Sequence, residues 1–214
     1  MKDQIIESIK QNKLIVIVRG VKREHLIPLA EAMYAGGVRL LEITYDPKGV
    51  TPDEETAAGI RDLATHFDGR MLIGAGTVLT EKQVELTKEA GGRFIISPNT
   101  SRAVIGRTVA CGLVSIPGAL TPSEVVSAYD YGADFVKLFP IADLGVSYVK
   151  AVRAPLSHIP LLAVGGIDLD NIKDYAAAGV CGFGIGSSIV NRRLIEAGDF
   201  EAITDLARQY VEAI

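Results

Sequence analysis

The chain alternates between short apolar runs and longer segments whose apolar residues recur at helical spacing. Strands of a parallel sheet that is covered by helices on its outer face carry nearly continuous apolar sequence. The eight apolar runs are Leu14–Val18, Arg39–Ile43, Met71–Ala75, Arg93–Ser97, Leu113–Pro117, Asp134–Phe139, Pro160–Val164 and Val180–Ile185. Clear helical patterns between them are Glu24–Tyr34, Glu81–Ala90, Pro122–Tyr131 and Asp170–Ala178. This alternation predicts eight βα units.

The residues between these segments are typical of helix ends. Glycine follows the predicted helices just before the strands, where it can adopt the left-handed conformation that ends a helix. Capping residues precede other helices. The glycines are Gly36, Gly91, Gly112, Gly132 and Gly179, and the capping residues are Thr80, Ser101, Thr121 and Asp168. No linker or change of composition divides the chain, so we expect one domain over residues 1–214.

Eight units of this kind favour an α/β fold that closes into a (β/α)8 TIM barrel. The alternative is an open, doubly wound sheet. No GxGxxG motif follows the first strand, and no irregularity in the repeat marks a reversal of strand order. The amphipathic segment Met1–Lys13 precedes the first strand, and we expect it to form an extra helix that covers the N-terminal end of the barrel.

Charge and composition exclude several classes of protein. The formal net charge is −4 and the basic residues are scattered, which argues against a nucleic-acid surface. The two cysteines and three histidines have no metal-ligand spacing. No apolar run is long enough to cross a membrane, and the N-terminus has no apolar core typical of a signal peptide. We therefore expect a cytoplasmic protein with no metal site.

In such a barrel the chemistry gathers at the carboxyl ends of the strands. Lys137 lies in the sixth apolar run, where its amine faces either the lumen or the helices and is desolvated in both cases. Burial lowers the pKa of a lysine, and the neutral amine is the nucleophile that forms Schiff bases. The alternatives are a structural buried ion pair, or a side chain that extends out to solvent.

Three other strand ends carry polar residues that could serve the same chemistry. Glu42 is a second charge inside a buried strand, and it could pair with Lys137 at rest and move protons during the reaction. An ionised Glu42 would raise the pKa of Lys137, and a nearby Arg19 would oppose that effect. Arg19 ends the first strand, and its guanidinium group has the geometry to donate two hydrogen bonds to a carboxylate. The Thr77 hydroxyl could donate a hydrogen bond to the same carboxylate. Without a functional role, Arg19 would be a surface arginine at a strand end and Thr77 would supply a hydroxyl to a turn or helix cap.

Glycines follow the last two strands. Phosphate sites in barrels are often built from these two loops. Gly165 and Gly166 follow the seventh strand, while Gly186 and Ser187 follow the eighth. Glycine lets backbone N–H groups approach an anion, and the serine adds a hydroxyl. The two loops together predict a phosphate site.

The chain resembles the 2-keto-3-deoxy-6-phosphogluconate (KDPG)/4-hydroxy-2-oxoglutarate (KHG) aldolase family, including its 6-phosphogalactonate branch. The matching segments run in order along nearly the whole chain: Ile17–Arg19, Gly36–Val38, Leu41–Thr44, Gly74–Val78, Ile96–Pro98, Pro117–Gly118, Val136–Pro140, Val164–Gly166 and Ile185–Ser187. The resemblance implies a (β/α)8 barrel that works as a homotrimer without metal or cofactor. It implies that the substrate is a small 2-keto acid phosphate, which is cleaved to pyruvate and glyceraldehyde 3-phosphate.

The resemblance also implies roles for individual residues. Lys137 corresponds to the imine-forming lysine and Glu42 to the carboxylate that shuttles protons. The expected carboxylate-binding residues are Arg19 and Thr77, with Pro98 packed beside the imine. Gly165, Gly166, Gly186 and Ser187 correspond to the phosphate cradle.

The sequence departs from the family pattern at two positions. Asp46 stands where some members carry an arginine, which leaves Arg19 to bind the carboxylate alone. Val164 stands where some members carry a threonine that precedes the glycine pair. Three other functions stay open: a 4-hydroxy-2-oxoglutarate aldolase, a phosphosugar isomerase or epimerase, and a non-catalytic binder of sugar-acid phosphates.

Overall fold

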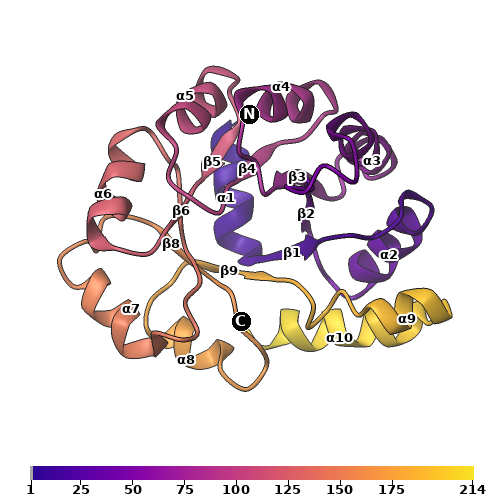
Figure 1. Cartoon of the computed structure of the whole chain (residues 1–214). Helices are drawn as coiled ribbons and strands as arrows, with labels where there is room; N and C mark the ends of the chain where they lie inside the picture. The colour runs from indigo at the N-terminus through magenta and orange to yellow at the C-terminus, as the bar shows by residue number, and fades with distance from the viewer. Residues whose placement is uncertain (1) are drawn as a thin grey trace.

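The computed structural model describes residues 2–214, and its strands form one parallel sheet that closes into a barrel. Figure 1 shows the strands as an inner ring with the helices around them. The strands are β1 (Leu14–Val18), β2 (Leu40–Thr44), β3 (Leu72–Gly76), β4 (Phe94–Ile96), β5 (Val114–Ile116), β6 (Gly118–Ala119), β7 (Val136–Leu138), β8 (Leu161–Val164) and β9 (Gly182–Ile185).

Hydrogen bonds close this ring. β1 pairs with β2 on one side and with β9 on the other. The fifth barrel strand is interrupted at Pro117, since β5 pairs with β4 while β6 pairs with β7. Proline has no N–H to donate to a ladder, which accounts for the break. The prediction of a (β/α)8 barrel is confirmed, although the fifth strand extends beyond its predicted end at Pro117.

Helices connect the strands and form the outer layer (Figure 1). They are α2 (Arg23–Ala35), α3 (Asp53–His66), α4 (Glu81–Glu89), α5 (Arg102–Ala110), α6 (Pro122–Asp130), α7 (Gly145–Arg153), α8 (Ile172–Ala177), α9 (Arg192–Ala197) and α10 (Phe200–Glu212). Thr80, Ser101 and Thr121 cap α4, α5 and α6 as predicted. The expected start at Asp168 is wrong, because α8 begins after Asn171 while Asp168 accepts backbone hydrogen bonds within the preceding turn.

The extra N-terminal helix α1 (Lys2–Asn12) lies across the barrel axis in Figure 1. Ile5 and Ile9 are buried and pack with residues that fill the barrel interior. Lys2 Nζ lies 2.9 Å from a carboxylate oxygen of Asp134, at the N-terminal side of β7. The predicted cover of the N-terminal end is therefore present, and Met1 of the predicted range lies outside the described residues.

Side chains alternate between two hydrophobic clusters. On β1, Leu14, Val16 and Val18 pack against the helices, while Ile15 and Ile17 fill the interior. This alternation follows from the two-residue period of a strand. A polar residue in the interior set therefore points into the lumen, which is how the barrel positions its site. No helix in residues 2–214 is long and apolar enough to span a membrane.

Candidate active site

Lys137 points into the lumen of the barrel. Its neighbours Val136 and Leu138 belong to the outer cluster, whereas Phe135 and Phe139 belong to the inner one. The Lys137 side chain is buried, and its Nζ lies 4.4 Å from the centroid of the Phe139 ring. The sequence left open whether the Lys137 amine faces the lumen or the helices, and in the structure it faces the lumen. The side chain does not extend out to solvent.

Glu42 enters the same lumen from the opposite wall. β2 and β7 lie four barrel strands apart, and both Glu42 and Lys137 line one small cavity of about 10 Å³. That volume is close to the minimum that one water molecule needs. The other lining residues are apolar or glycine, among them Ile17, Ile96 and Val164. Glu42 Oε2 is buried and has no hydrogen-bond partner among residues 2–214.

Burial favours the neutral forms of both the Glu42 carboxyl group and the Lys137 amine. The pKa of Glu42 is raised to about 7, chiefly by desolvation, while the charges of Lys137 and Arg19 act to lower it. The pKa of Lys137 is lowered, again chiefly by desolvation, although the Glu42 charge opposes this shift and Arg19 adds to it. Desolvation therefore outweighs the attraction to Glu42, and this shift favours the neutral form of the amine, which is the nucleophile.

Arg19 and Thr77 meet at the mouth of the barrel. Arg19 follows β1 and Thr77 follows β3, and the Arg19 Nη2 donates to the Thr77 hydroxyl at 3.4 Å. Both residues line a groove of about 880 Å³ between the loops after β1 and β2. Arg19 is exposed, so its guanidinium can reach a ligand in this groove. The two residues expected to bind one carboxylate are thus placed side by side.

The backbone of Thr77 adopts a strained conformation. Its φ is +54°, in the left-handed region that a β-branched residue rarely enters. Such a conformation costs on the order of 1–3 kcal/mol and persists where the surroundings enforce it, often at functional sites. The conformation turns the chain directly after β3 and brings the Thr77 hydroxyl to Arg19.

Asp46, the first departure from the family pattern, organises its own loop. Its carboxylate accepts hydrogen bonds from the backbone N–H groups of Lys48, Val50 and Thr51. These bonds lower the pKa of Asp46. The residue therefore fixes the shape of the β2–α3 loop beside the groove and supplies no cation to it.

Pro98 lies against β6, the strand that pairs with the Lys137 strand β7. Lys137 is the register partner of Gly118, and a Cβ atom on Gly118 would come within 2.4 Å of the Pro98 carbonyl oxygen. The preceding residue, Ser97, is anchored by a hydrogen bond from its hydroxyl to the Val78 carbonyl at 2.8 Å. These contacts place the Pro98 backbone against β6, and its packing beside the imine stays a prediction.

The two glycine-containing loops adjoin each other because β8 pairs with β9. Gly165 and Gly166 have φ values of +93° and +76°, which only glycine adopts readily. Asn171 holds this loop, since its Nδ2 donates to the Gly166 carbonyl at 2.9 Å. Across the pair, Ser187 is exposed after Gly186. The predicted phosphate loops therefore lie together at the carboxyl ends of their strands.

Phe139 is a site residue that the sequence did not single out. One side of its ring faces the Lys137 amine, and a Cβ atom on Gly165 would lie 3.1 Å from the same ring. The ring thus occupies the space between the amine and the first glycine loop. Its two-residue offset from Lys137 on an alternating strand was the available signal, because it places both side chains on the lumen face.

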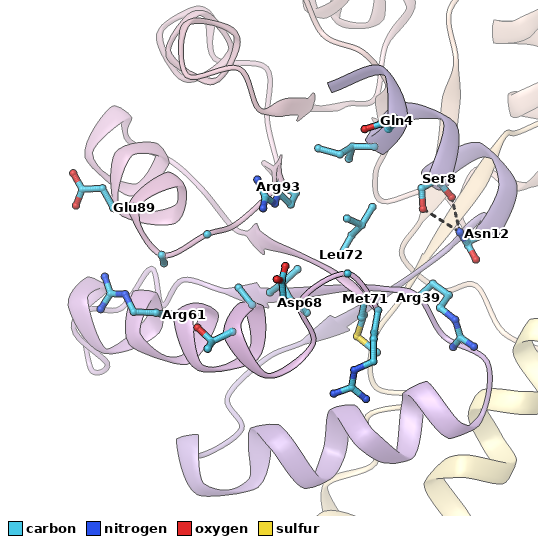
Figure 2. A pocket seen from close by; sticks show the side chains of 18 residues that line it. Gln4, Ser8, Asn12, Arg39, Arg61, Asp68, Met71, Leu72, Glu89 and Arg93 are labelled. Carbon is cyan, nitrogen blue, oxygen red and sulfur yellow. Dashed lines mark hydrogen bonds between the residues drawn. The ribbon is translucent and has the colours of Figure 1, made fainter. Parts of the chain in front are cut away.

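A second hollow lies at the other end of the barrel. Its volume is about 750 Å³. Figure 2 shows Gln4 and Ser8 of α1 on one side of it, with Arg93 and Asp68 facing it. Its lining includes Leu72 at the start of β3, so it opens at the N-terminal end. None of its described lining residues is a lysine.

The sequence matches the family model for KDPG and KHG aldolases over residues 5–206. The chain belongs to this family. It is 38% identical over 200 residues to the probable 2-dehydro-3-deoxy-6-phosphogalactonate aldolase of Rhizobium meliloti (strain 1021), covering 92% of this chain and 91% of that protein. It is also 38% identical over 209 residues to the KHG/KDPG aldolase of Escherichia coli (strain K12), covering 96% and 94%.

Solved structures of the family share the fold. The crystal structure of KDPG aldolase from Legionella pneumophila, with pyruvate captured at low pH as a covalent carbinolamine intermediate, superposes with a TM-score of 0.85. It is 30% identical to this KDPG/KHG aldolase family member and covers 97% of both chains. A native KDPGal structure gives a TM-score of 0.82 at 32% identity, covering 94% of this chain and 95% of that one.

Proposed function

We propose that the chain is a class I aldolase that cleaves a 2-keto-3-deoxy-6-phospho sugar acid to pyruvate and glyceraldehyde 3-phosphate through a Schiff base on Lys137. The single observation that carries this proposal is the buried amine of Lys137, which faces a carboxylate in a lumen with room for about one water molecule. The carbinolamine captured in the relative from Legionella pneumophila supports the same chemistry.

The reaction begins when the neutral Lys137 amine attacks the keto carbon of the substrate. The carbinolamine loses water to give a protonated imine, which withdraws electrons from the neighbouring carbons. The bond between C3 and C4 then breaks as the C4 hydroxyl loses its proton, and its electron pair forms an enamine. Protonation of the enamine at C3 and hydrolysis of the imine release pyruvate and restore the amine.

Glu42 moves the protons in these steps. A carboxyl group with a pKa of about 7 is present in both protonated and ionised forms near neutral pH. It can therefore donate a proton when water leaves and accept one from the C4 hydroxyl. Its Oε2 has no hydrogen-bond partner in the described structure, so no other residue competes with the substrate for that oxygen.

The other site residues hold the two ends of the substrate. Arg19 and Thr77 bind the carboxylate through charge-assisted hydrogen bonds, with Pro98 packed beside the imine. The loops with Gly165, Gly166, Gly186 and Ser187 receive the phosphate. The reaction needs no metal ion, because the protonated imine supplies the electron sink that a metal would otherwise provide.

A second candidate activity is the cleavage of 4-hydroxy-2-oxoglutarate, which the name of the relative from Escherichia coli supports. This substrate shares the 2-keto acid part and lacks the phosphate. Following the family resemblance, we also propose that the protein acts as a homotrimer in the cytoplasm, as one domain over residues 1–214.

Borohydride trapping tests the proposal. The protein is incubated with pyruvate, reduced with borohydride, weighed intact and mapped by peptide mass spectrometry. A reduced pyruvyl adduct on Lys137 supports imine chemistry, whereas an unchanged mass would favour an isomerase or a non-catalytic binder. Turnover of a panel of phosphorylated and unphosphorylated 2-keto acids then separates the two aldolase activities.

A further inference from the structure

The third barrel strand presents no side chain to the lumen at two successive inward positions. β3 carries glycine at residues 74 and 76, with Ala75 between them in the outer cluster. Side chains from the two neighbouring strands fill the space. The Phe94 ring from β4 lies over Gly74, where an added Cβ atom would come within 2.3 Å of it.

The carboxylate of Glu42 lies over the other glycine. A Cβ atom on Gly76 would come within 2.3 Å of Glu42 Oε1 and 2.7 Å of its carboxyl carbon. In the β2–β3 register the partner of Glu42 is Gly74, while Gly76 is the partner of Thr44. The Glu42 side chain therefore reaches two residues toward the mouth of the barrel, across the face of β3, to lie against Gly76.

This contact distinguishes the two oxygens of the carboxylate. Oε1 occupies the space where a Cβ atom on Gly76 would stand, whereas Oε2 is the buried atom that has no hydrogen-bond partner in the described chain. Real Cβ atoms do not approach a neighbour to 2.3 Å, and a close-packed interior resists such an insertion. Any side chain at residue 76 would have to displace the carboxylate.

We propose that Gly76 is a positioning residue for the aldol reaction: its missing side chain provides the seat that holds the Glu42 carboxylate in the lumen opposite Lys137. This inference rests on the proposed function. It assigns to the glycine a role through Glu42 and no contact with the substrate. The Thr44 methyl group, 3.0 Å from the same added Cβ, closes the seat on the side of the mouth.

The test compares three glycine-to-alanine variants. Gly76→Ala should lower kcat about 10²-fold, the loss that a misplacement of about 1 Å can cause. Gly74→Ala introduces an equally severe clash on the same strand, but against Phe94, so it should destabilise the fold without shifting the pH profile of kcat. Gly106→Ala lies in α5 with no atom within 4 Å of the added Cβ and should leave both properties unchanged.

The pH profile separates positioning from packing. In Gly76→Ala the carboxylate moves out of its buried seat, so its pKa should fall toward the ordinary value. The acid limb of the kcat profile should then shift by about one pH unit or more to lower pH. A Gly76→Ala protein whose profile matches that of wild type, with a kcat loss similar to that of Gly74→Ala, would overturn the inference.

The Glu42→Asp background gives the second arm. Aspartate is one methylene shorter, so its carboxylate does not reach the seat. The loss of kcat caused by Gly76→Ala should therefore be several-fold smaller in this background than in wild type. The loss of stability, measured by urea unfolding, should be smaller as well. The inference would be contradicted if Gly76→Ala lowered kcat and the free energy of unfolding equally in wild type and in Glu42→Asp. It would also be contradicted if neither Gly76→Ala nor the double variant folded, because the clash would then not depend on the Glu42 carboxylate.

The two proposals can fail separately. If wild type gives no borohydride-trapped pyruvyl adduct on Lys137, the proposed function itself fails. If wild type forms the adduct but Gly76→Ala shows no coupling to Glu42, only the role of Gly76 is rejected.

Discussion

Lys137 and Glu42 lie on opposite walls of the barrel lumen and line one small cavity, yet no ion pair joins them within the described residues. The sequence allowed an ion pair at rest. In the structure the pKa of Glu42 is raised and that of Lys137 is lowered, so both shifts favour the neutral form. For each group the cost of desolvation exceeds the attraction to the opposite charge. Burial thus favours a neutral amine that faces, across the lumen, a carboxyl group able to give and take a proton, which is the arrangement that imine formation needs.

The variant Lys137→Met should abolish cleavage and the trapped pyruvyl adduct while the protein stays folded. Methionine fills a similar volume without a charge that the interior must desolvate, so the free energy of unfolding should stay equal or rise. The folded-state pKa of Lys137 lies below its ordinary value, so the penalty of burying the ammonium is present at neutral pH. The gain from the substitution should therefore shrink as pH rises toward 10.5.

Urea unfolding between pH 7 and pH 10 checks this expectation, together with circular dichroism of the folded variant. A variant that unfolds and loses activity together would show that Lys137 has a structural role. The substitution Lys150→Met, on the exposed face of α7, is a control that should change neither the trapping nor the stability by much.

Glu42→Gln should lower kcat about 10²- to 10⁴-fold, the usual contribution of general acid–base catalysis. It should also change how stability depends on pH. The Glu42 pKa is about 7 in the folded protein and 4.5 in the unfolded chain, so the folded state binds more protons between these values. Wild-type stability attributable to Glu42 is therefore full below pH 4.5 and is lost as pH rises to about 7.

Glutamine does not titrate, so the stability difference between Glu42→Gln and wild type should move in favour of the variant across this range. The shift amounts to on the order of 3 kcal/mol. Parallel urea titrations at pH 5 and pH 8 measure it. A difference that stays constant between the two pH values would mean that the carboxyl group titrates normally.

The fold could be predicted from the sequence because apolar periodicity and glycine-terminated helices repeat along the whole chain. The same pattern located the strand ends, and with them Lys137, Glu42 and Arg19. The ends of individual strands and helices were predicted less well where a proline or a capping side chain decides them. The fifth strand continues past Pro117, and α8 begins after Asn171 rather than at Asp168.

The detailed geometry of the site could not be predicted in this way. The alternation along the strand indicated only that Phe139 shares the lumen face with Lys137, and the contact of its ring with the amine needed the structure. The seat at Gly76 depends on the side-chain directions of neighbouring strands, and the left-handed backbone of Thr77 depends on the turn after β3. Asp46 was noted only as a departure from the family pattern. Its three hydrogen bonds to backbone N–H groups show that it organises a loop.

Asp46→Ala should loosen the β2–α3 loop. The carboxylate no longer binds the N–H groups of Lys48, Val50 and Thr51, so their amide hydrogen exchange should accelerate and KM should rise because the loop lines the groove beside Arg19. In wild type the folded-state pKa of Asp46 lies below 3.8, so the loop order is present above that pH and is lost as pH falls through the lowered value. Asp46→Asn, which retains one acceptor oxygen, should lie between the two proteins, and equal exchange rates in all three would reject this role.

Ser187→Asp should impair phosphorylated substrates far more than free pyruvate. The added carboxylate stands in the loop after β9 that we assign to the phosphate, where two negative charges repel each other. The KM of a 2-keto-3-deoxy-6-phospho sugar acid should rise at least about 10-fold, equivalent to about 1.4 kcal/mol, while the rate of borohydride trapping with pyruvate stays near that of wild type. Ser188→Asp puts the same charge one residue further along, at another exposed position, and should have a smaller effect. Equal losses for the phosphorylated substrate and for pyruvate would place the phosphate elsewhere, since a distorted barrel mouth harms both alike.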